Sequence, residues 1–361
     1  MSRVVAAMSG GVDSSVAAAL LAQQRGEDEV IGVWMRTHAD LPEGYELSRS
    51  CCSPDAADDA RRVAQLIDIP FFTLNVEREF GERVIDTFVD AYLDGATPNP
   101  CQACNQYIKF DELLHRGLAA YGADAVATGH YARLEHRDGR WRLLRAADAD
   151  KDQTYFLWVL DQDQLSRTRF PLGDLTKPEV RKIASELRLP TADKPESQEI
   201  CFVPLGDYRA LLEERRGYAG DPGPIIDVDG TRVGTHTGYA HYTVGQRHGL
   251  GVALGEAVYV REVLPSTNTL VIGRRDEIAQ RTFTVHDARF TAGEPPRERF
   301  DASVRIRHRA PDVAAELTMV GRDRFLVETA EPVWAPAPGQ AAVLYDGAEC
   351  LGGGRIARSD A

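Results

Sequence analysis

The chain has 361 residues and a formal net charge of −13, with 43% hydrophobic and 27% charged residues. This composition is typical of globular proteins and excludes wholesale disorder, collagen-like structure and coiled coils. No apolar run approaches the roughly 20 residues of a membrane-spanning helix, and the apolar start of the chain is too short for a secretory signal. We therefore expect a cytoplasmic protein with no membrane partner. The acidic balance also argues against a basic nucleic-acid coat protein.

The first half of the chain alternates short apolar runs with helical patterns. The apolar runs are typical of buried parallel strands and comprise residues 4–8, 30–35, 71–75 and 125–129. Helices are expected at residues 12–24, 55–66, 84–92, 110–121 and 177–188, the last with Thr176 as its N-cap. This alternation predicts an α/β domain in which helices cover both faces of a Rossmann-like parallel sheet.

Short β-rich runs with many Gly and Pro residues dominate the chain after about residue 207. Strands are expected at residues 257–263, 269–272, 302–309, 325–328 and 341–345. Short strands separated by turns are typical of small barrels. We therefore divide the chain into an α/β domain of residues 1–206, a small connector domain of residues 207–275 and a C-terminal β-barrel of residues 276–361.

A glycine-rich loop follows the first expected strand, where residues 9–15 read Ser-Gly-Gly-Val-Asp-Ser-Ser. Its glycines let backbone amides approach a ligand, and the N-terminus of the following helix attracts phosphate. Asp13 can orient the loop or help to hold Mg²⁺. The string is neither a Walker A motif nor Gly-x-Gly-x-x-Gly, and by itself it could be a plain turn that caps a helix. It resembles the signature of PP-loop ATP-pyrophosphatases (adenine nucleotide alpha hydrolase-like), which cleave ATP to AMP and pyrophosphate and adenylate an acceptor oxygen.

Six cysteines are too few for a disulfide scaffold in a chain of this size. Cys101 and Cys104 form a single Cys-x-x-Cys pair, and Cys201 stands far along the chain. Alone, the pair could be half a zinc site, a dithiol redox pair or two core thiols. A structural zinc site with four cysteines is disfavoured because no second Cys-x-x-Cys pair follows.

A series of sequence boxes along nearly the whole chain closely resembles the tRNA-specific 2-thiouridylases, bacterial and organellar enzymes that thiolate the wobble uridine of certain tRNAs. No single short box would be decisive, but their order is specific. The boxes are the loop at residues 9–15, Ser50-Cys51-Cys52-Ser53, Asn-Pro-x-x-x-Cys-Asn at residues 99–105, Thr128-Gly129-His130-Tyr131, residues 151–157, Ile200-Cys201-Phe202, residues 243–247 and residues 350–354.

The resemblance implies a reaction and its partners. Cys104 matches the nucleophile, and Cys201 matches the cysteine that carries a persulfide. ATP, with Mg²⁺, would adenylate the C2 oxygen of the uridine, the persulfide sulfur would attack C2, and AMP would leave. The two cysteines could then close a disulfide. The tRNAs would be those for Lys, Glu and Gln, and the sulfur would come from a cysteine desulfurase or a sulfur-relay protein.

One position departs from part of the family, because some members have Asp where this chain has Cys101. Three thiolates, from Cys101, Cys104 and Cys201, could instead hold a [4Fe-4S] cluster with one open iron. The persulfide route and the cluster route use the same residues, so both remain open here. Cys51 and Cys52 receive no chemical role, and Cys350 is expected to be buried in the barrel.

The resemblance also implies the binding residues. The ATP-binding positions are Ala7, Met8, Ser9, Gly10, Gly11, Val12, Asp13, Ser14, Met35 and Gly129. The tRNA-binding positions are Asn99, Pro100, Cys101, His130, Lys151, Asp152, Gln153, Arg307, His308 and Gln340. Core packing of the methionines, a structural histidine and a solvated turn at residues 151–153 are the plainer alternatives.

The expected barrel carries an arginine pattern of its own. Arg305, Arg307 and Arg309 alternate along one expected strand, which would place all three on one face. Such a stripe suits the phosphates of tRNA, and a solvated barrel face is the alternative. Two other functions compete with tRNA 2-thiolation. One is a PP-loop ligase or thiolase with a different acceptor, and the other is a nucleotide-binding sensor that does not turn over ATP.

Overall fold

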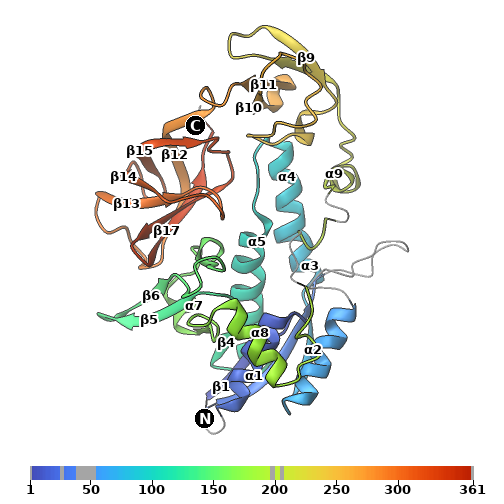
Figure 1. Ribbon diagram of the computed structural model, residues 1–361, viewed down its shortest axis with the longest axis vertical. Coiled ribbons are helices and arrows are strands. Elements are labelled where there is room, and N and C mark those ends of the chain that lie inside the picture. Colours follow the sequence, from blue (N-terminus) through green and yellow to red (C-terminus); the bar gives the residue numbers. More distant parts are fainter. Residues whose placement is uncertain (1, 25–27, 38–53, 196–199, 204–206, 359–361) are drawn as a thin grey trace.

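The computed structural model describes residues 2–24, 28–37, 54–195, 200–203 and 207–358. Three sheets organise this described part of the chain: a parallel sheet near the N-terminus, a small sheet at the opposite end of the molecule and a barrel beside the long helical region that joins them (Figure 1). No helix within these described ranges is both long enough and apolar enough to span a membrane. Cys51 and Cys52 lie outside the described residues.

The parallel sheet has the strand order β3-β2-β1-β4-β7. Its strands are β1 (Ser2–Ala7), β2 (Asp28–Arg36), β3 (Phe71–Asn75), β4 (Ala125–Ala127) and β7 (Thr168–Arg169). Successive side chains of a strand point to opposite faces, and β1 shows the result. Val5 packs in the core on one face, whereas Val4 and Ala6 pack in the core on the other. The prediction of a parallel sheet covered on both faces is confirmed.

Helices α1 (Val12–Gln23), α2 (Pro54–Leu66) and α8 (Lys177–Glu186) contribute Val16, Ala60 and Val180 to one of these cores. The expected N-cap of α8 is confirmed, since Glu179 accepts hydrogen bonds from the backbone N–H and the hydroxyl of Thr176, both at 2.7 Å. Such a capping contact satisfies amide groups that a helix end leaves open.

The other face is covered by two long helical segments, each interrupted by a π-helical stretch. The first consists of α3 (Glu77–Phe80), η1 (Gly81–Asp86) and α4 (Thr87–Leu93). The second consists of α5 (Pro100–Ala103), η2 (Cys104–Glu112) and α6 (Leu113–Tyr121). The patterns at 84–92 and 110–121 predicted only the later parts of these segments. π-Helical turns are rare and often mark functional sites, and η2 begins at Cys104.

The connector forms a four-stranded sheet with the order β10-β11-β8-β9. Its elements are α9 (Arg209–Arg216), β8 (Gly223–Ile226), β9 (Arg232–His236), η5 (Tyr239–His241), β10 (Tyr259–Leu264), η6 (Pro265–Thr267) and β11 (Thr269–Gly273). The two strands expected in this region correspond to β10 and β11. Tyr239 donates a hydrogen bond to the carbonyl of Leu93 (2.9 Å), which ties the connector to the end of α4.

Six antiparallel strands close the C-terminal barrel, because β12 pairs with both β15 and β17. They are β12 (Ala279–Phe290), β13 (Arg299–Arg305), β14 (Val313–Met319), β15 (Phe325–Trp334), β16 (Ala341–Asp346) and β17 (Glu349–Ile356). The prediction of a C-terminal barrel is confirmed. The predicted arginine stripe is wrong, because β13 ends at Arg305 and the chain turns at Arg307 and Arg309. Alternation along a strand therefore does not apply to these three residues.

A hairpin from the α/β domain extends the barrel sheet, which the sequence patterns did not predict. It consists of β5 (Arg133–Arg137) and β6 (Arg140–Leu144), and Leu143 of β6 pairs with Cys350 of β17. Cys350 is fully buried, as expected. The short elements η3 (Thr154–Phe156) and α7 (Gln162–Ser166) follow the hairpin. Tyr155 of η3 is also fully buried, in a core shared with β16 and β17. Strand pairing and this shared core fix the barrel on the α/β domain.

Candidate active site

One cavity of ≈ 330 Å³ lies at the carboxyl edge of the parallel sheet, where open α/β sheets bind their ligands. It brings together the ends of β1, β2 and β4, the start of the helix that carries two cysteines, and the short segment that carries a third. The predicted site residues that line it are Ala7, Met8, Ser9, Asp13, Ser14, Met35, Pro100, Cys101, Cys104, Gly129, His130, Gln153 and Cys201.

The loop after β1 is packed so closely that two positions must be glycine, Gly10 within the loop and Gly129 after β4. Gly10 has φ +70°, and a Cβ there would lie 2.1 Å from the carbonyl oxygen of Ala56 in α2. A Cβ on Gly129 would lie 2.6 Å from the amide nitrogen of Ser14. The hydroxyl of Ser14 accepts from the amide of Ser9 and donates to the carbonyl of Gly11, both at 3.1 Å. The loop is thus held in one shape against the first turn of α1.

Asp13 has partners within the protein. The Lys177 ammonium contacts both Asp13 carboxylate oxygens at 2.7 and 2.8 Å, and the Tyr131 hydroxyl donates to Oδ1 at 2.8 Å. A second lysine, Lys194, donates to the carbonyl of Gly10 at 3.0 Å. These contacts favour the interpretation that Asp13 orients the loop. Sequence reasoning missed both lysines, because no motif marks them and only the fold brings them to the loop.

The cysteines of the cavity come from two separate segments of the chain. Pro100 opens the helix after Asn99, Cys101 is exposed, and Cys104 is half-buried at the start of η2. A thiolate near a helix N-terminus is stabilised by the partial positive charge there. Cys201, in the short described segment of residues 200–203, is also half-buried. Its neighbour Phe202 is buried against the rings of Phe80 and Phe88, at centroid distances of 5.7 and 5.3 Å.

The three thiols share a cavity, but in this arrangement they do not form a metal-binding set. Across the described ranges, no group of three or more His, Cys, Asp or Glu side chains could hold a metal ion. The residues present therefore do not fit a cluster ligated by Cys101, Cys104 and Cys201 as they stand.

His130 sits beside Lys109 in the wall of the cavity. Its Nε2 lies 3.4 Å from the Lys109 ammonium and its Nδ1 lies 2.7 Å from the hydroxyl of Thr128. Burial, and secondarily the charge of Lys109, hold the pKa of His130 well below its usual value of 6.5. The ring is therefore neutral near pH 7. Because an ammonium can only donate, Nε2 is the acceptor and Nδ1 carries the proton.

The turn that carries Gln153 is clamped from several sides. Gln153 and Tyr131 are joined by two hydrogen bonds of 2.9 Å. The backbone N–H of Tyr131 donates to the side-chain Oε1 of Gln153, and the backbone N–H of Gln153 donates to the carbonyl of Tyr131. The cysteine helix holds the next residues, since Gln102 donates to the carbonyl of Tyr155 at 3.2 Å and Asn105 donates to that of Phe156 at 3.1 Å.

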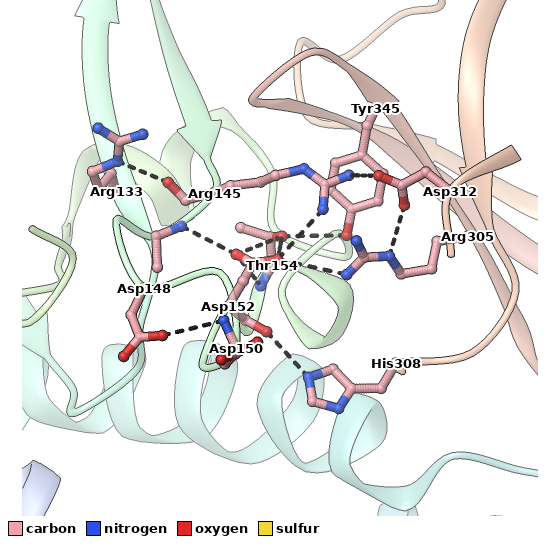
Figure 2. A network of polar contacts seen from close by, with 11 residues as sticks. Arg133, Arg145, Asp148, Asp150, Asp152, Thr154, Arg305, His308, Asp312 and Tyr345 are labelled. Atoms are coloured by element: carbon pink, nitrogen blue, oxygen red, sulfur yellow. Dashed lines mark hydrogen bonds and ion pairs between the residues drawn. The ribbon is translucent and has the colours of Figure 1, made fainter. Parts of the chain in front are cut away.

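Asp152 lies at the centre of a polar network between the α/β domain and the barrel (Figure 2). Its side chain is only 2% exposed, and it accepts hydrogen bonds from the Ala146 amide (3.1 Å) and from the Thr154 hydroxyl (2.8 Å). The guanidinium groups of Arg145 and Arg305 each lie 3.9 Å away. Both arginines also form ion pairs with Asp312. The carboxylates of Asp152 and Asp312 therefore balance the two positive charges within the network.

Three further residues predicted to bind tRNA, His308, Arg307 and Gln340, lie at the junction with the barrel. His308 donates through Nε2 to the backbone carbonyl of Asp152 at 3.1 Å, as Figure 2 shows. Arg307 donates to the carbonyl of Ala335 at 2.8 Å, and Gln340 donates to that of Thr97 at 2.9 Å. None of these three residues lines the cavity described above.

A second cavity of ≈ 400 Å³ lies between α4, the segment before the cysteine helix and the barrel. Asn99 lines this cavity, together with Pro100, which borders both. The barrel contributes His286, Arg355 and Arg358, which sequence reasoning did not single out. Lys151 is half-buried in the turn before Asp152 and lines neither cavity.

The fold and the site together define a PP-loop enzyme, with a nucleotide loop and cysteines at one sheet edge and an antiparallel barrel docked beside them. Three sequence-family models match, described as a tRNA methyl transferase HUP domain (residues 2–205), a tRNA methyl transferase PRC-barrel domain (residues 209–274) and an aminomethyltransferase beta-barrel domain (residues 280–356). The chain belongs to the tRNA-specific 2-thiouridylase family, because proteins of that name match essentially its whole length at 48–49% identity.

Similar proteins cover essentially the whole chain. The tRNA-specific 2-thiouridylase MnmA of Carboxydothermus hydrogenoformans is 49% identical, over 98% of this chain and 97% of its own. MnmA of Chloroflexus aggregans is 48% identical, over 100% of this chain and 99% of its own. A solved structure, the U34-tRNA thiolase NcsA from Methanococcus maripaludis with its [4Fe-4S] cluster, is 20% identical with a TM-score of 0.35, covering 59% of this chain and 66% of that one. That likeness is too weak for its cluster to bear on the cysteines here.

Proposed function

We propose that this chain is an ATP-dependent tRNA uridine 2-sulfurtransferase, which thiolates C2 of the wobble uridine in the tRNAs for Lys, Glu and Gln. One observation carries the proposal: the nucleotide loop, Cys104 and Cys201 line the same cavity. An enzyme that activates a base with ATP and then delivers sulfur to it needs both functions within reach of one atom.

The proposed course begins at the loop, where the C2 oxygen of uridine attacks the α-phosphate of ATP and pyrophosphate leaves. Adenylation is needed because a carbonyl oxygen is a poor leaving group, whereas AMP is a good one. The terminal sulfur of a Cys201 persulfide then bonds to C2. The Cys104 thiolate attacks the inner sulfur of Cys201, which breaks the persulfide S–S bond and closes a Cys104–Cys201 disulfide. The sulfur stays on C2 as AMP departs, and a reductant reopens the disulfide.

Several side chains of the protein would contribute to this reaction. Lys177 and Tyr131 hold Asp13 and therefore the loop. We expect Mg²⁺ to arrive with the phosphates rather than in a cage of protein ligands. Neutral His130, whose Nε2 accepts from Lys109, would hold that ammonium in the cavity wall. The persulfide would be supplied by a cysteine desulfurase or a sulfur-relay protein.

The test uses anaerobically purified protein, with wild type beside Cys101→Ala, Cys104→Ala and Cys201→Ala. Sulfur incorporation into unmodified tRNA, AMP release and iron content are measured on the same samples. We expect iron-free wild type to thiolate tRNA with a persulfide donor, Cys104→Ala and Cys201→Ala to lose thiolation, and Cys101→Ala to lose least.

Three results would contradict the proposal in different ways. Activity that follows iron content and needs all three cysteines would replace the persulfide route with a cluster route. ATP turnover to AMP without sulfur in any tRNA would point to another acceptor. Binding of ATP without any turnover would instead support the alternative that the protein is a nucleotide-binding sensor.

A further inference from the structure

Asn105 carries a buried acceptor that no described residue satisfies. The residue is 2% exposed and lines the cavity that holds the loop and the cysteines. Its Nδ2 donates to the carbonyl of Phe156, which fixes the amide orientation and identifies the other atom as Oδ1. Within the described ranges, Oδ1 accepts no hydrogen bond and has almost no contact with solvent.

Such an atom is costly. A buried polar group without a partner destabilises a protein, and native structures keep few of them, often at functional sites. The bond to Phe156 prevents the amide from rotating to relieve the cost, because rotation would place two carbonyl oxygens against each other. A ligand that donates a hydrogen bond at this point would remove the penalty.

We propose that Asn105 is a specificity-determining residue, whose Oδ1 accepts the N3–H of the target uracil and so distinguishes uracil from cytosine. This inference rests on the proposed function and deepens it. Asn105 follows Cys104 directly and lies on the same π-helical segment. Cys201 lines the same cavity, so a base that places C2 at the reacting sulfur can turn N3, the atom bonded to C2, toward Oδ1.

The chemistry of the two pyrimidines makes the distinction. N3 of uracil carries a hydrogen and donates, whereas N3 of cytosine has a lone pair and accepts. Cytosine would place two acceptors against each other in a site without water. A site built for a hydrogen bond rejects a ligand that cannot form it far more strongly than an apolar pocket rejects a change of shape.

The experiment compares kcat/KM for thiolation of anticodon stem-loops that carry uridine or 3-deazauridine at the wobble position. The analogue has C–H in place of N3–H at nearly constant size, and its C4 oxygen is a hydroxyl, so the comparison is made between the two proteins for each substrate. Wild type and Asn105→Ala are assayed with both substrates, so that the ratio of ratios isolates the contact. We expect wild type to prefer uridine by about 10- to 100-fold more than Asn105→Ala does.

Gln102→Ala is the matched control. Gln102 is a buried amide one turn earlier and donates to the carbonyl of Tyr155, the residue before Phe156, but it does not line this cavity. Loss of its anchor should leave the ratio of uridine to 3-deazauridine at the wild-type value. Thermal unfolding of both variants checks their folding, and wild type with the two substrates tests the inference if Asn105→Ala does not fold.

Three outcomes would overturn the assignment. Equal ratios in wild type and Asn105→Ala would remove any role in reading N3. Weaker ATP binding in Asn105→Ala with an unchanged ratio would assign Oδ1 to the adenine amine instead. Wild type that thiolates uridine and 3-deazauridine equally would sink the inference alone, whereas wild type that thiolates no tRNA would overturn the proposed function as well.

Discussion

Lys177 binds both carboxylate oxygens of Asp13, at 2.7 and 2.8 Å, although the two residues are 164 positions apart in the sequence. Lys177 is the first residue of α8, and its side chain is only 10% exposed. The pair therefore connects the nucleotide loop to a helix whose start is itself fixed by the Thr176–Glu179 capping contact. Asp13 orientation thus depends on a residue that lies outside every sequence motif.

We predict that Lys177→Met lowers kcat/KM for ATP about 10- to 100-fold, because Asp13 and the loop lose their anchor. Methionine keeps most of the apolar stem, so packing should change little. Lys182→Met on the same helix is the control, since Lys182 is 75% exposed and its ion pair with Glu186, at 3.8 Å, lies on the surface. Steady-state AMP release checks both variants. A twofold or smaller change in Lys177→Met would remove the anchoring role.

His130 should make stability depend on pH. The folded-state pKa lies well below 6.5, so the unfolded ring takes up a proton first as the solution is acidified. The contribution to stability is complete above about pH 6.5 and is lost as pH falls toward the folded-state pKa, with a slope of at most about 1.4 kcal/mol per pH unit.

Denaturant unfolding at several pH values between about 7.5 and 5.5 measures this effect. We expect the free energy of unfolding of His130→Gln to fall less steeply with acidification than that of wild type. His236 and His241, whose pKa values are also lowered by burial, remain in both proteins and cancel in the comparison. Parallel curves would show that the ring does not titrate as described.

The Asp152 network should matter for stability. Asp152→Asn leaves Arg145 and Arg305 facing a neutral group in a buried site, and we expect it to lower the free energy of unfolding by about 2–4 kcal/mol. Asp150→Asn, at an exposed position of the same turn, should change it by less than about 0.5 kcal/mol.

The measurement for this pair is equilibrium unfolding, with tRNA affinity at two salt concentrations as a second readout. Because the Asp152 side chain is enclosed within the protein, the salt dependence of tRNA binding should stay the same in the folded variant. A stable Asp152→Asn protein with a changed salt dependence would instead support direct contact with tRNA.

Cysteine reactivity should separate Cys350 from Cys101. Burial raises the pKa of the Cys350 thiol to about 12, so it is neither ionised nor accessible near pH 8, whereas Cys101 is exposed. We expect iodoacetamide to modify Cys101 in the native protein and Cys350 only in denaturant, because the thiolate is the nucleophile. Peptide mapping by mass spectrometry records modification at both sites. Labelling of Cys350 in the native protein would contradict its burial in β17, where it pairs with Leu143 of β6.

Local patterns were enough to predict several parts of the molecule. The run at residues 71–75 is the strand β3, and the helix after the Gly-Gly turn is α1. These elements follow from side-chain periodicity and turn residues, which act over a few neighbours. The motifs also named more than half of the residues that line the cavity, and several of these, such as Met8, Met35 and Gly129, lie at the ends of predicted strands.

What the sequence by itself determined is thus the parallel sheet, the loop chemistry and the set of cysteines. Only the tertiary structure decided that Lys177 holds Asp13, that the β5–β6 hairpin joins the barrel and that Asp152 is enclosed by Arg145 and Arg305. The end of β13 at Arg305, which removed the predicted arginine stripe, belongs to the same group. The physical reason is that long-range contacts depend on which surfaces pack together, and no local period records that choice.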